Sequence, residues 1–274
     1  MSVSNQIIKK IKELKKDNSL GSYSHIKNIL FNQFIPVFCT EVRPYKIIRY
    51  RKHNEDNRND LFNTSEDLSY RKDILNISNF GRANEPGQGF FYCNDNKNQD
   101  TGISEIVSVL RGNHDSEEEV LTIGAWNLMQ SLKLAIILPL KSSFLSQEDL
   151  KNMEKFYSQI AEGNELEEIK KLVNFIAEEY YLDIDKDNSN YKITAAFSNY
   201  VRNVFPEIDG IMYSSIKSEH TGINIVLWPE IVDSKLEFAA ARKTVFKKTQ
   251  EKTFVEEVIA ESKMYDTKSD IITC

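Results

Sequence analysis

Residues 80–89 constrain the backbone more than any other stretch of this chain, because they contain too much glycine and proline for a regular helix or strand. They read Phe-Gly-Arg-Ala-Asn-Glu-Pro-Gly-Gln-Gly. Glycine and proline at this density mark a backbone held in turns, and glycine lets a ligand approach the main chain closely. Loops carried by a rigid sheet are common places for binding groups. We therefore expect a functional loop that presents Arg82 and Asn84.

The composition is that of an ordinary globular protein. The chain has 274 residues, of which 41% are hydrophobic and 28% charged, so it is long enough to form a substantial core. The net charge of −6 argues against a nucleic-acid-binding protein, which would carry clustered positive charge. No signal peptide or membrane-spanning run is visible. We expect a soluble, cytoplasmic protein with no membrane partner.

The cysteines and histidines do not predict a metal site. Cys39, Cys93 and Cys274 are far apart and form no CxxC pair, which argues against a disulfide scaffold and against zinc. The four histidines are scattered and lack the spacing of metal ligands. We expect neither a metal nor a resident cofactor.

The order of helical and strand-like segments predicts an α+β fold. Two helices at residues 4–16 and 24–34 suggest a small N-terminal extension, residues 1–40, before a main domain, residues 41–274. The first is amphipathic and rich in lysine; docking on its own domain is favoured over contact with a partner or membrane. Further helices are expected from Thr101, at residues 146–181 with a break at 163–164, and at 191–205. Strands are expected at residues 45–51, 89–93, 118–126, 133–140, 210–216, 222–228, 236–249 and 253–263.

Arg49 and Arg51 lie two residues apart in the first of these strands, so they share one face of the sheet. Such arginines are often exposed charges that protect a sheet edge from aggregation. Alternatively, two adjacent guanidinium groups form a clamp for phosphate oxygens. The strand alone favours the first interpretation.

Tyr92 and Glu105 also admit two interpretations each. Tyr92 closes an aromatic run, Phe90-Phe91-Tyr92, which is typical of a core strand, although alternation directs at least one ring to the other face. Glu105 lies near the start of a predicted helix, where a carboxylate favourably meets the helix dipole. An aromatic run of this kind more often belongs to the core than to a binding site, whereas for Glu105 contact with a ligand and the dipole role are about equally favoured.

Four segments in a fixed order resemble the RES domain family, which is named for its arginine, glutamate and serine. They are Ile48-Arg49-Tyr50-Arg51, Gly81-Arg82-Ala83-Asn84 running to Tyr92, Thr101-Gly-Ile-Ser-Glu105, and Gly210-Ile-Met-Tyr-Ser-Ser215 followed by Gly222-Ile-Asn224. Members of this family are NAD-degrading toxins of bacterial toxin–antitoxin pairs. The resemblance covers about residues 43–245. It implies an ADP-ribosyltransferase-like β core, mixed or antiparallel and flanked by helices, with a helical insert at about residues 142–192.

The resemblance also implies roles for individual residues. Glu105, Arg49 and Ser215 would be catalytic, with Arg51 a second candidate for the family's first arginine. The residues implied to bind NAD are Arg49, Arg51, Arg82, Asn84, Tyr92, Ser215 and Asn224. Ser214 stands where the family usually has proline, which leaves open whether Ser214 or Ser215 acts.

These residues suit cleavage of the bond between nicotinamide and ribose. Positive charge grows on the sugar as the bond breaks, and a fixed carboxylate such as Glu105 stabilises it. NAD is then a substrate, and the acceptor is water or phosphate. Two other functions remain as alternatives: ADP-ribosyl transfer to a macromolecule, and an inactive module that only binds NAD. The family implies a separate antitoxin protein as partner, and the residues leave open a homo-oligomer.

Overall fold

The computed structural model describes most of the chain. The described residues are 2–17, 19–43, 46–53, 62, 64–95, 102–103, 107, 118–140, 146–182, 188–215, 222–248 and 254–263. The contacts divide the chain into two compact units, each assembled from separate segments. Unit 1 comprises Met1–Glu41, Asp73–Phe90 and Leu132–Ser214, and unit 2 comprises Val42–Lys72, Phe91–Ser131 and Ser215–Cys274.

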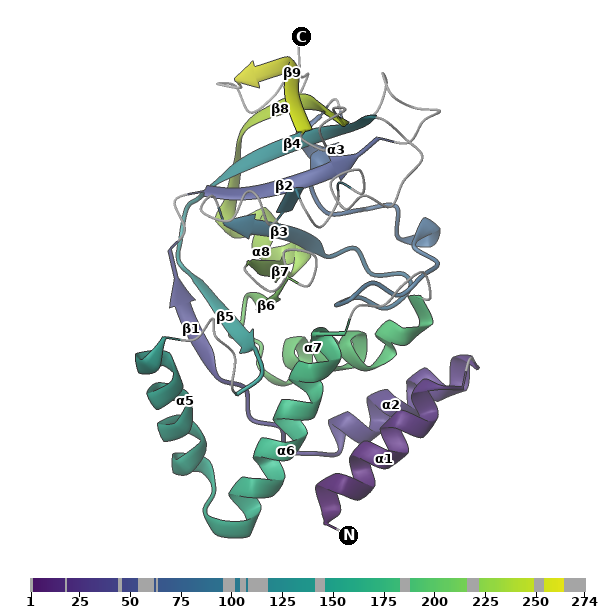
Figure 1. The fold of residues 1–274 in the computed structure, drawn as a ribbon, viewed down its shortest axis with the longest axis vertical. Coiled ribbons are helices and arrows are strands. Elements are labelled where there is room, and N and C mark those ends of the chain that lie inside the picture. Colours follow the sequence, from purple (N-terminus) through teal and green to yellow (C-terminus); the bar gives the residue numbers. More distant parts are fainter. Residues whose placement is uncertain are drawn as a thin grey trace. The chain divides into compact units, whose positions relative to one another are not determined.

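Unit 1 combines helices with a short three-stranded arrangement (Figure 1). Its helices are α1 (Val3–Lys15), α2 (Leu20–Phe31), α5 (Gln147–Ile160), α6 (Gly163–Tyr180) and α7 (Lys192–Val204), with 3₁₀ turns at Ile74–Asn76 and Asn188–Tyr191. Its strands are β1 (Cys39–Val42), β5 (Leu132–Ile137) and β6 (Gly210–Ser214), in the order β1-β5-β6. β5 and β6 run parallel, with Leu134 opposite Gly210.

Helix α7 forms the centre of unit 1. Every side chain from Lys192 to Val201 is buried, as expected for a helix that is covered on all sides. The helix packs against α2 and α6, and α1 packs against both α2 and α6. Residues 1–41 therefore pack with the other segments of unit 1. The domain limits predicted from the sequence stay predictions.

Unit 2 is an antiparallel sheet with few helices (Figure 1). Its strands are β2 (Lys46–Lys52), β3 (Phe91–Asp95), β4 (Glu118–Leu128), β7 (Ile223–Leu227), β8 (Leu236–Lys248) and β9 (Phe254–Lys263), in the order β7-β3-β2-β4-β8-β9. The two short helices are α3 (Ser65–Leu68) and α8 (Pro229–Lys235). Neighbouring strands alternate in direction throughout this sheet.

The α+β class predicted from the sequence is confirmed, whereas the likeness to ADP-ribosyltransferases stays a prediction. The predicted break at residues 163–164 is confirmed, since α5 ends at Ile160 and α6 begins at Gly163. The second helix begins earlier than predicted, because the Ser19 hydroxyl accepts the Ser22 N–H and so caps it. The strand predicted at 89–93 instead spans Phe91–Asp95. The sequence patterns did not predict β1, α3 and α8.

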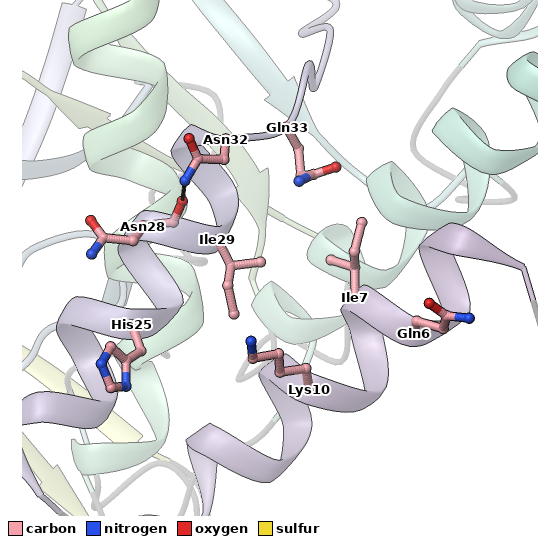
Figure 2. Close-up of a pocket in the computed structure, with 8 residues that line it drawn as sticks. All are labelled: Gln6, Ile7, Lys10, His25, Asn28, Ile29, Asn32 and Gln33. Atoms are coloured by element: carbon pink, nitrogen blue, oxygen red, sulfur yellow. Dashed lines mark hydrogen bonds between the residues drawn. The ribbon is translucent and has the colours of Figure 1, made fainter.

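A groove of about 630 Å³ lies between α1 and α2, bordered by side chains that include Ile7, Lys10 and Ile29 (Figure 2). It is an open surface feature of unit 1. None of the residues predicted to bind NAD lines it.

A carboxylate on α6 fixes the start of α1. Glu168 Oε2 accepts the Ser4 backbone N–H at 2.8 Å. This bond, followed by the Ser4 hydroxyl, lowers the pKa of Glu168 from 4.5 to about 2. Because the pKa is lowered in the folded protein, the bond stabilises the fold fully above pH 4.5, and this contribution disappears as the pH falls toward 2.

We therefore expect Glu168→Gln to reduce the acid sensitivity of the chain. Urea unfolding followed from about pH 6 to about pH 2 should show a shallower loss of unfolding free energy in the variant than in the wild type. Glu165→Gln, an exposed position on the same helix, is the control and should keep the wild-type slope. Equal slopes for all three proteins would contradict the assignment.

Candidate functional site

The two arginines of β2 lie together on one face of unit 2, as the sequence predicted. Arg49 places its guanidinium over the Phe91 ring at 4.7 Å, and the Arg51 guanidinium lies near enough to lower the pKa of Arg49. Arg51 also donates to the Ser69 carbonyl at 2.7 Å and lies over the Phe62 ring at 5.6 Å. The segment that contains α3 therefore holds Arg51 in place.

Arg49 is a buried positive charge, and no carboxylate among the described residues compensates it. Arg49 is only 5% exposed to solvent. Its Nη1 donates to the Tyr92 carbonyl at a long 3.4 Å, and its Nε has no hydrogen-bond partner among the described residues. Within the part of the chain that the structure describes, no carboxylate pairs with it. Burial, and next the charge of Arg51, lower the pKa of Arg49 well below its ordinary value.

A glycine on the neighbouring strand leaves room for the Trp126 ring, which packs against the aromatic support of this arginine. Gly124 of β4 lies directly opposite Arg49. A methyl group on Gly124 would come within 2.6 Å of the Trp126 ring, and that ring packs edge-on against Phe91 at 5.0 Å. Because Phe91 carries the Arg49 guanidinium, Gly124 is part of the arginine's support. The sequence did not single out this glycine.

Strands β2 and β3 pair at only two described positions, both directly before Arg49 in the sequence of β2. Their register covers Ile47 with Asp95 and Ile48 with Asn94, and no later pair forms between the described residues of the two strands. The Arg49 guanidinium donates a hydrogen bond to the Tyr92 carbonyl. The Arg49 side chain thus contacts the β3 backbone beyond the two paired positions.

Tyr92 and Asn224 lie on the opposite face of the sheet from the arginines. Successive side chains of a strand point to opposite faces, so Tyr92 points away from the face on which Phe91 supports Arg49. Asn94 shares the face of Tyr92. It donates to the Ile223 carbonyl at 2.7 Å and to Asn224 Oδ1 at 3.1 Å, which places Asn224 there as well. The structure therefore brings Tyr92 near Asn224 and separates the side chains of both from those of the arginines.

Asn94 is a site residue that sequence reasoning missed. It is 4% exposed and ties β3 to β7 through two hydrogen bonds from one amide. Buried amides of this kind are usually fully hydrogen-bonded and fix their neighbours in place. The available signal was a polar residue inside an otherwise apolar and aromatic strand.

The segment that leads to Glu105 starts on the face of Asn94. A methyl group on Gly102 would lie 2.1 Å from the Tyr50 ring and 2.6 Å from Asn94 Oδ1, so only glycine permits this close approach. Ile103 and Val107 join the apolar cluster that contains Ile48 and Tyr50. Glu105 itself lies outside the described residues.

In unit 1, Arg82 is bound to the end of a helix. Its Nη1 donates to the Tyr180 carbonyl at 2.7 Å and to the Leu182 carbonyl at 3.2 Å, and its guanidinium lies 4.9 Å from the Tyr191 ring centre. A cation is favourable there, because the last carbonyls of α6 carry partial negative charge. Arg82 therefore ties its loop to α6, and binding a phosphate would require it to share or exchange these partners.

Asn84 and the two candidate serines are buried. Asn84 closes a turn in unit 1, where its carbonyl accepts the Gly81 N–H at 2.9 Å. Ser214 ends β6 in unit 1, and no described residue forms a hydrogen bond with its hydroxyl. Ser215, in unit 2, donates its backbone N–H to the Gly222 carbonyl at 2.8 Å. The unpartnered hydroxyl of Ser214 keeps the choice between the two serines open.

Comparisons with known proteins add no family to this description: no protein family matches the chain, and no curated protein matches it. Among the described residues, no helix is long and apolar enough to cross a membrane. In the same part of the chain, no three His, Cys, Asp or Glu side chains gather as they would around a metal ion.

We expect Arg49→Met to stabilise the ligand-free protein. A buried charge without a partner opposes folding, and methionine fills a similar volume without charge. Chemical unfolding should show an unfolding free energy that is unchanged or higher by about 1 kcal/mol or more. Arg202→Met is the control, because Arg202 also lies over a phenylalanine ring, that of Phe90 at 5.5 Å, but is only half-buried. A clear loss of stability in Arg49→Met alone would show that Arg49 serves the fold.

Proposed function

We propose that this chain degrades NAD by cleaving the bond between nicotinamide and ribose, and that it acts as a growth-inhibiting toxin of the RES type. The observation that carries the proposal is the buried Arg49 guanidinium, whose Nε has no partner and whose charge is uncompensated among the described residues. A protein retains such a costly group where a ligand supplies the missing negative charge.

The diphosphate of NAD has the chemistry that this pair of arginines needs. Guanidinium groups bind phosphate oxygens through paired hydrogen bonds. A doubly charged diphosphate would also remove the repulsion between Arg49 and Arg51 that lowers the pKa of Arg49 in the ligand-free protein. Binding energy from this remote part of the substrate then fixes the ribose for reaction.

The other predicted residues would serve the nicotinamide end. Tyr92 and Asn224 lie on the face opposite Arg49, beside Asn94. The arginines would therefore hold the phosphates while this group contacts the nicotinamide ring and its carboxamide. The Arg49 guanidinium contacts the Tyr92 carbonyl, so the backbone of β3 connects the two groups, whose side chains point to opposite faces of the sheet.

The reaction itself needs one carboxylate and no metal. As the bond between C1′ and the nicotinamide nitrogen breaks, its electron pair returns to the ring, which leaves as a neutral molecule. The positive charge on the ribose would be stabilised by Glu105. Oxygen of water, or of phosphate, then bonds to C1′, and a water acceptor releases its proton. Ser215 would orient the ribose by a hydrogen bond.

We expect purified protein to convert NAD into nicotinamide and either ADP-ribose or its phosphate, as identified by mass. Glu105→Gln should lower kcat at least about a hundredfold, because it removes the charge that stabilises the transition state. Glu237→Gln, which changes an exposed glutamate of unit 2, should keep wild-type activity.

Two results would contradict the proposed function, and a third would contradict only the role of Glu105. Radiolabel that accumulates on a macromolecule would indicate ADP-ribosyl transfer instead. NAD binding without turnover would indicate a binding module. Full activity in Glu105→Gln would remove the catalytic assignment while leaving the substrate in place.

A further inference from the structure

The loop that carries Arg82 and Asn84 ends in a tight turn whose conformation is fixed by its sequence. The Gln88 N–H donates to the Glu85 carbonyl at 3.1 Å across Pro86 and Gly87. Gly87 has a φ of +81°. Proline in the second position and a glycine of positive φ in the third are typical of a type II turn. A second backbone bond, from the Gly87 N–H to the Ile77 carbonyl at 2.8 Å, closes the loop behind it.

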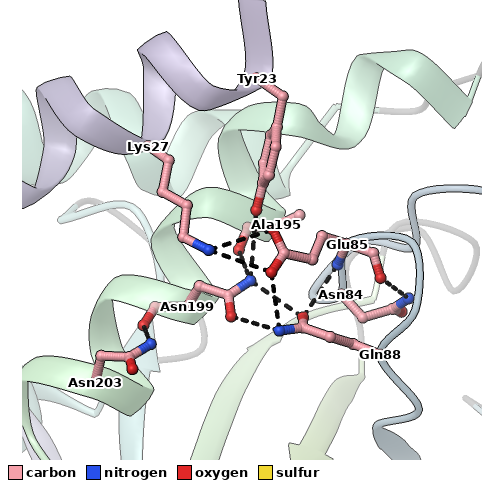
Figure 3. A network of polar contacts seen from close by, with 8 residues as sticks. All are labelled: Tyr23, Lys27, Asn84, Glu85, Gln88, Ala195, Asn199 and Asn203. Carbon is pink, nitrogen blue, oxygen red and sulfur yellow. Dashed lines mark hydrogen bonds and ion pairs between the residues drawn. The ribbon is translucent and has the colours of Figure 1, made fainter. Parts of the chain in front are cut away.

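The side chains of this turn are held by two helices (Figure 3). Lys27 of α2 pairs with Glu85 through both carboxylate oxygens, at 3.2 and 3.3 Å. Gln88 donates to Asn199 Oδ1 of α7 at 2.7 Å and accepts from Asn199 Nδ2 at 3.1 Å. The Gln88 and Glu85 side chains are also joined at 3.1 Å. The two-way bond between Gln88 and Asn199 fixes the orientation of both amides.

Tyr23 completes the contact between α2 and the turn. Burial, and next a hydrogen bond to Glu85, raise the pKa of Tyr23, so its hydroxyl stays neutral and able to donate to the carboxylate. The Tyr23 ring packs on Phe80 at 4.8 Å, at the start of the same loop. Lys27 lies over the Tyr23 ring at 5.9 Å. Residues of α2 therefore contact the loop at both of its ends.

We propose that α2 and α7 act as a support that sets the position of the Arg82–Asn84 loop, with Lys27, Tyr23 and Asn199 as positioning residues. Arg82 is anchored independently to the end of α6. The turn supported by Lys27 follows directly after Asn84, so loss of the support moves Asn84 and leaves the Arg82 anchor in place. Helix α2 thus holds the loop in position, and the role of the loop in NAD cleavage rests on the function proposed above.

The test compares three variants of the full chain. Lys27→Met removes the ion pair to Glu85, and Lys27→Arg retains it. Lys15→Met is the matched control, because Lys15 of α1 forms an ion pair of 2.7 Å with Glu179 that is farther from solvent and does not involve the loop. The measurements are hydrogen exchange at the Gly87 and Gln88 amides, and KM and kcat for NAD.

Lys27→Met should speed exchange at both amides at least about threefold, because the hydrogen bonds to the ion pair hold the turn closed. It should also raise KM with little change in kcat. Lys27→Arg should restore both values, and Lys15→Met should leave both unchanged although it lowers the overall stability.

The inference fails if Lys27→Met leaves exchange at Gly87 and Gln88 unchanged, or if Lys15→Met changes it equally. A change in exchange without a change in KM would remove the loop from NAD binding and overturn the positioning role. If the wild-type protein neither binds nor consumes NAD, the proposed function fails, and the exchange data alone then decide whether α2 supports the loop.

Discussion

The burial of Arg49 determines how the side chains around β2 and β3 pack in unit 2. A guanidinium removed from water without a carboxylate partner opposes folding, and the sheet compensates only in part. The Phe91 ring lies against its face, the Tyr92 carbonyl accepts one weak hydrogen bond, and Gly124 leaves the space that this packing requires. Arg51 adds like charge on the same face, and we propose that a bound anion offsets the charge of both arginines.

Unit 1 solves a different problem, the fixing of a polar loop on a helical scaffold. The glycines and the proline give the loop its turns, but they supply no side chains to hold it. Glu85 and Gln88 provide these contacts, and their partners come from α2 and α7. Arg82 adds a third contact at the end of α6. The helices that precede the main strands are therefore part of the same packing unit as the loop.

The sequence predicted local features well and longer-range ones less well. The alternation of a strand was enough to place Arg49 and Arg51 on one face, and glycine and proline were enough to predict a turn at residues 80–89. The separation of Tyr92 from the arginines was not predictable, because it depends on the register between β2 and β3, which no local pattern encodes. The same holds for Gly124 and Asn94, whose roles arise from neighbours on other strands. For Arg82, the sequence showed a cation in a loop but not the helix end that it binds.

An anion that completes the Arg49 site would be detected at the Nε–H resonance of Arg49 in the nuclear magnetic resonance spectrum of labelled protein. ADP-ribose, which carries the diphosphate but lacks the bond to be cleaved, is the ligand to titrate. We expect a specific downfield shift of this resonance that saturates with binding, because Nε would gain a hydrogen bond to the diphosphate. An unchanged Arg49 resonance at saturating ADP-ribose would contradict anion binding at Arg49.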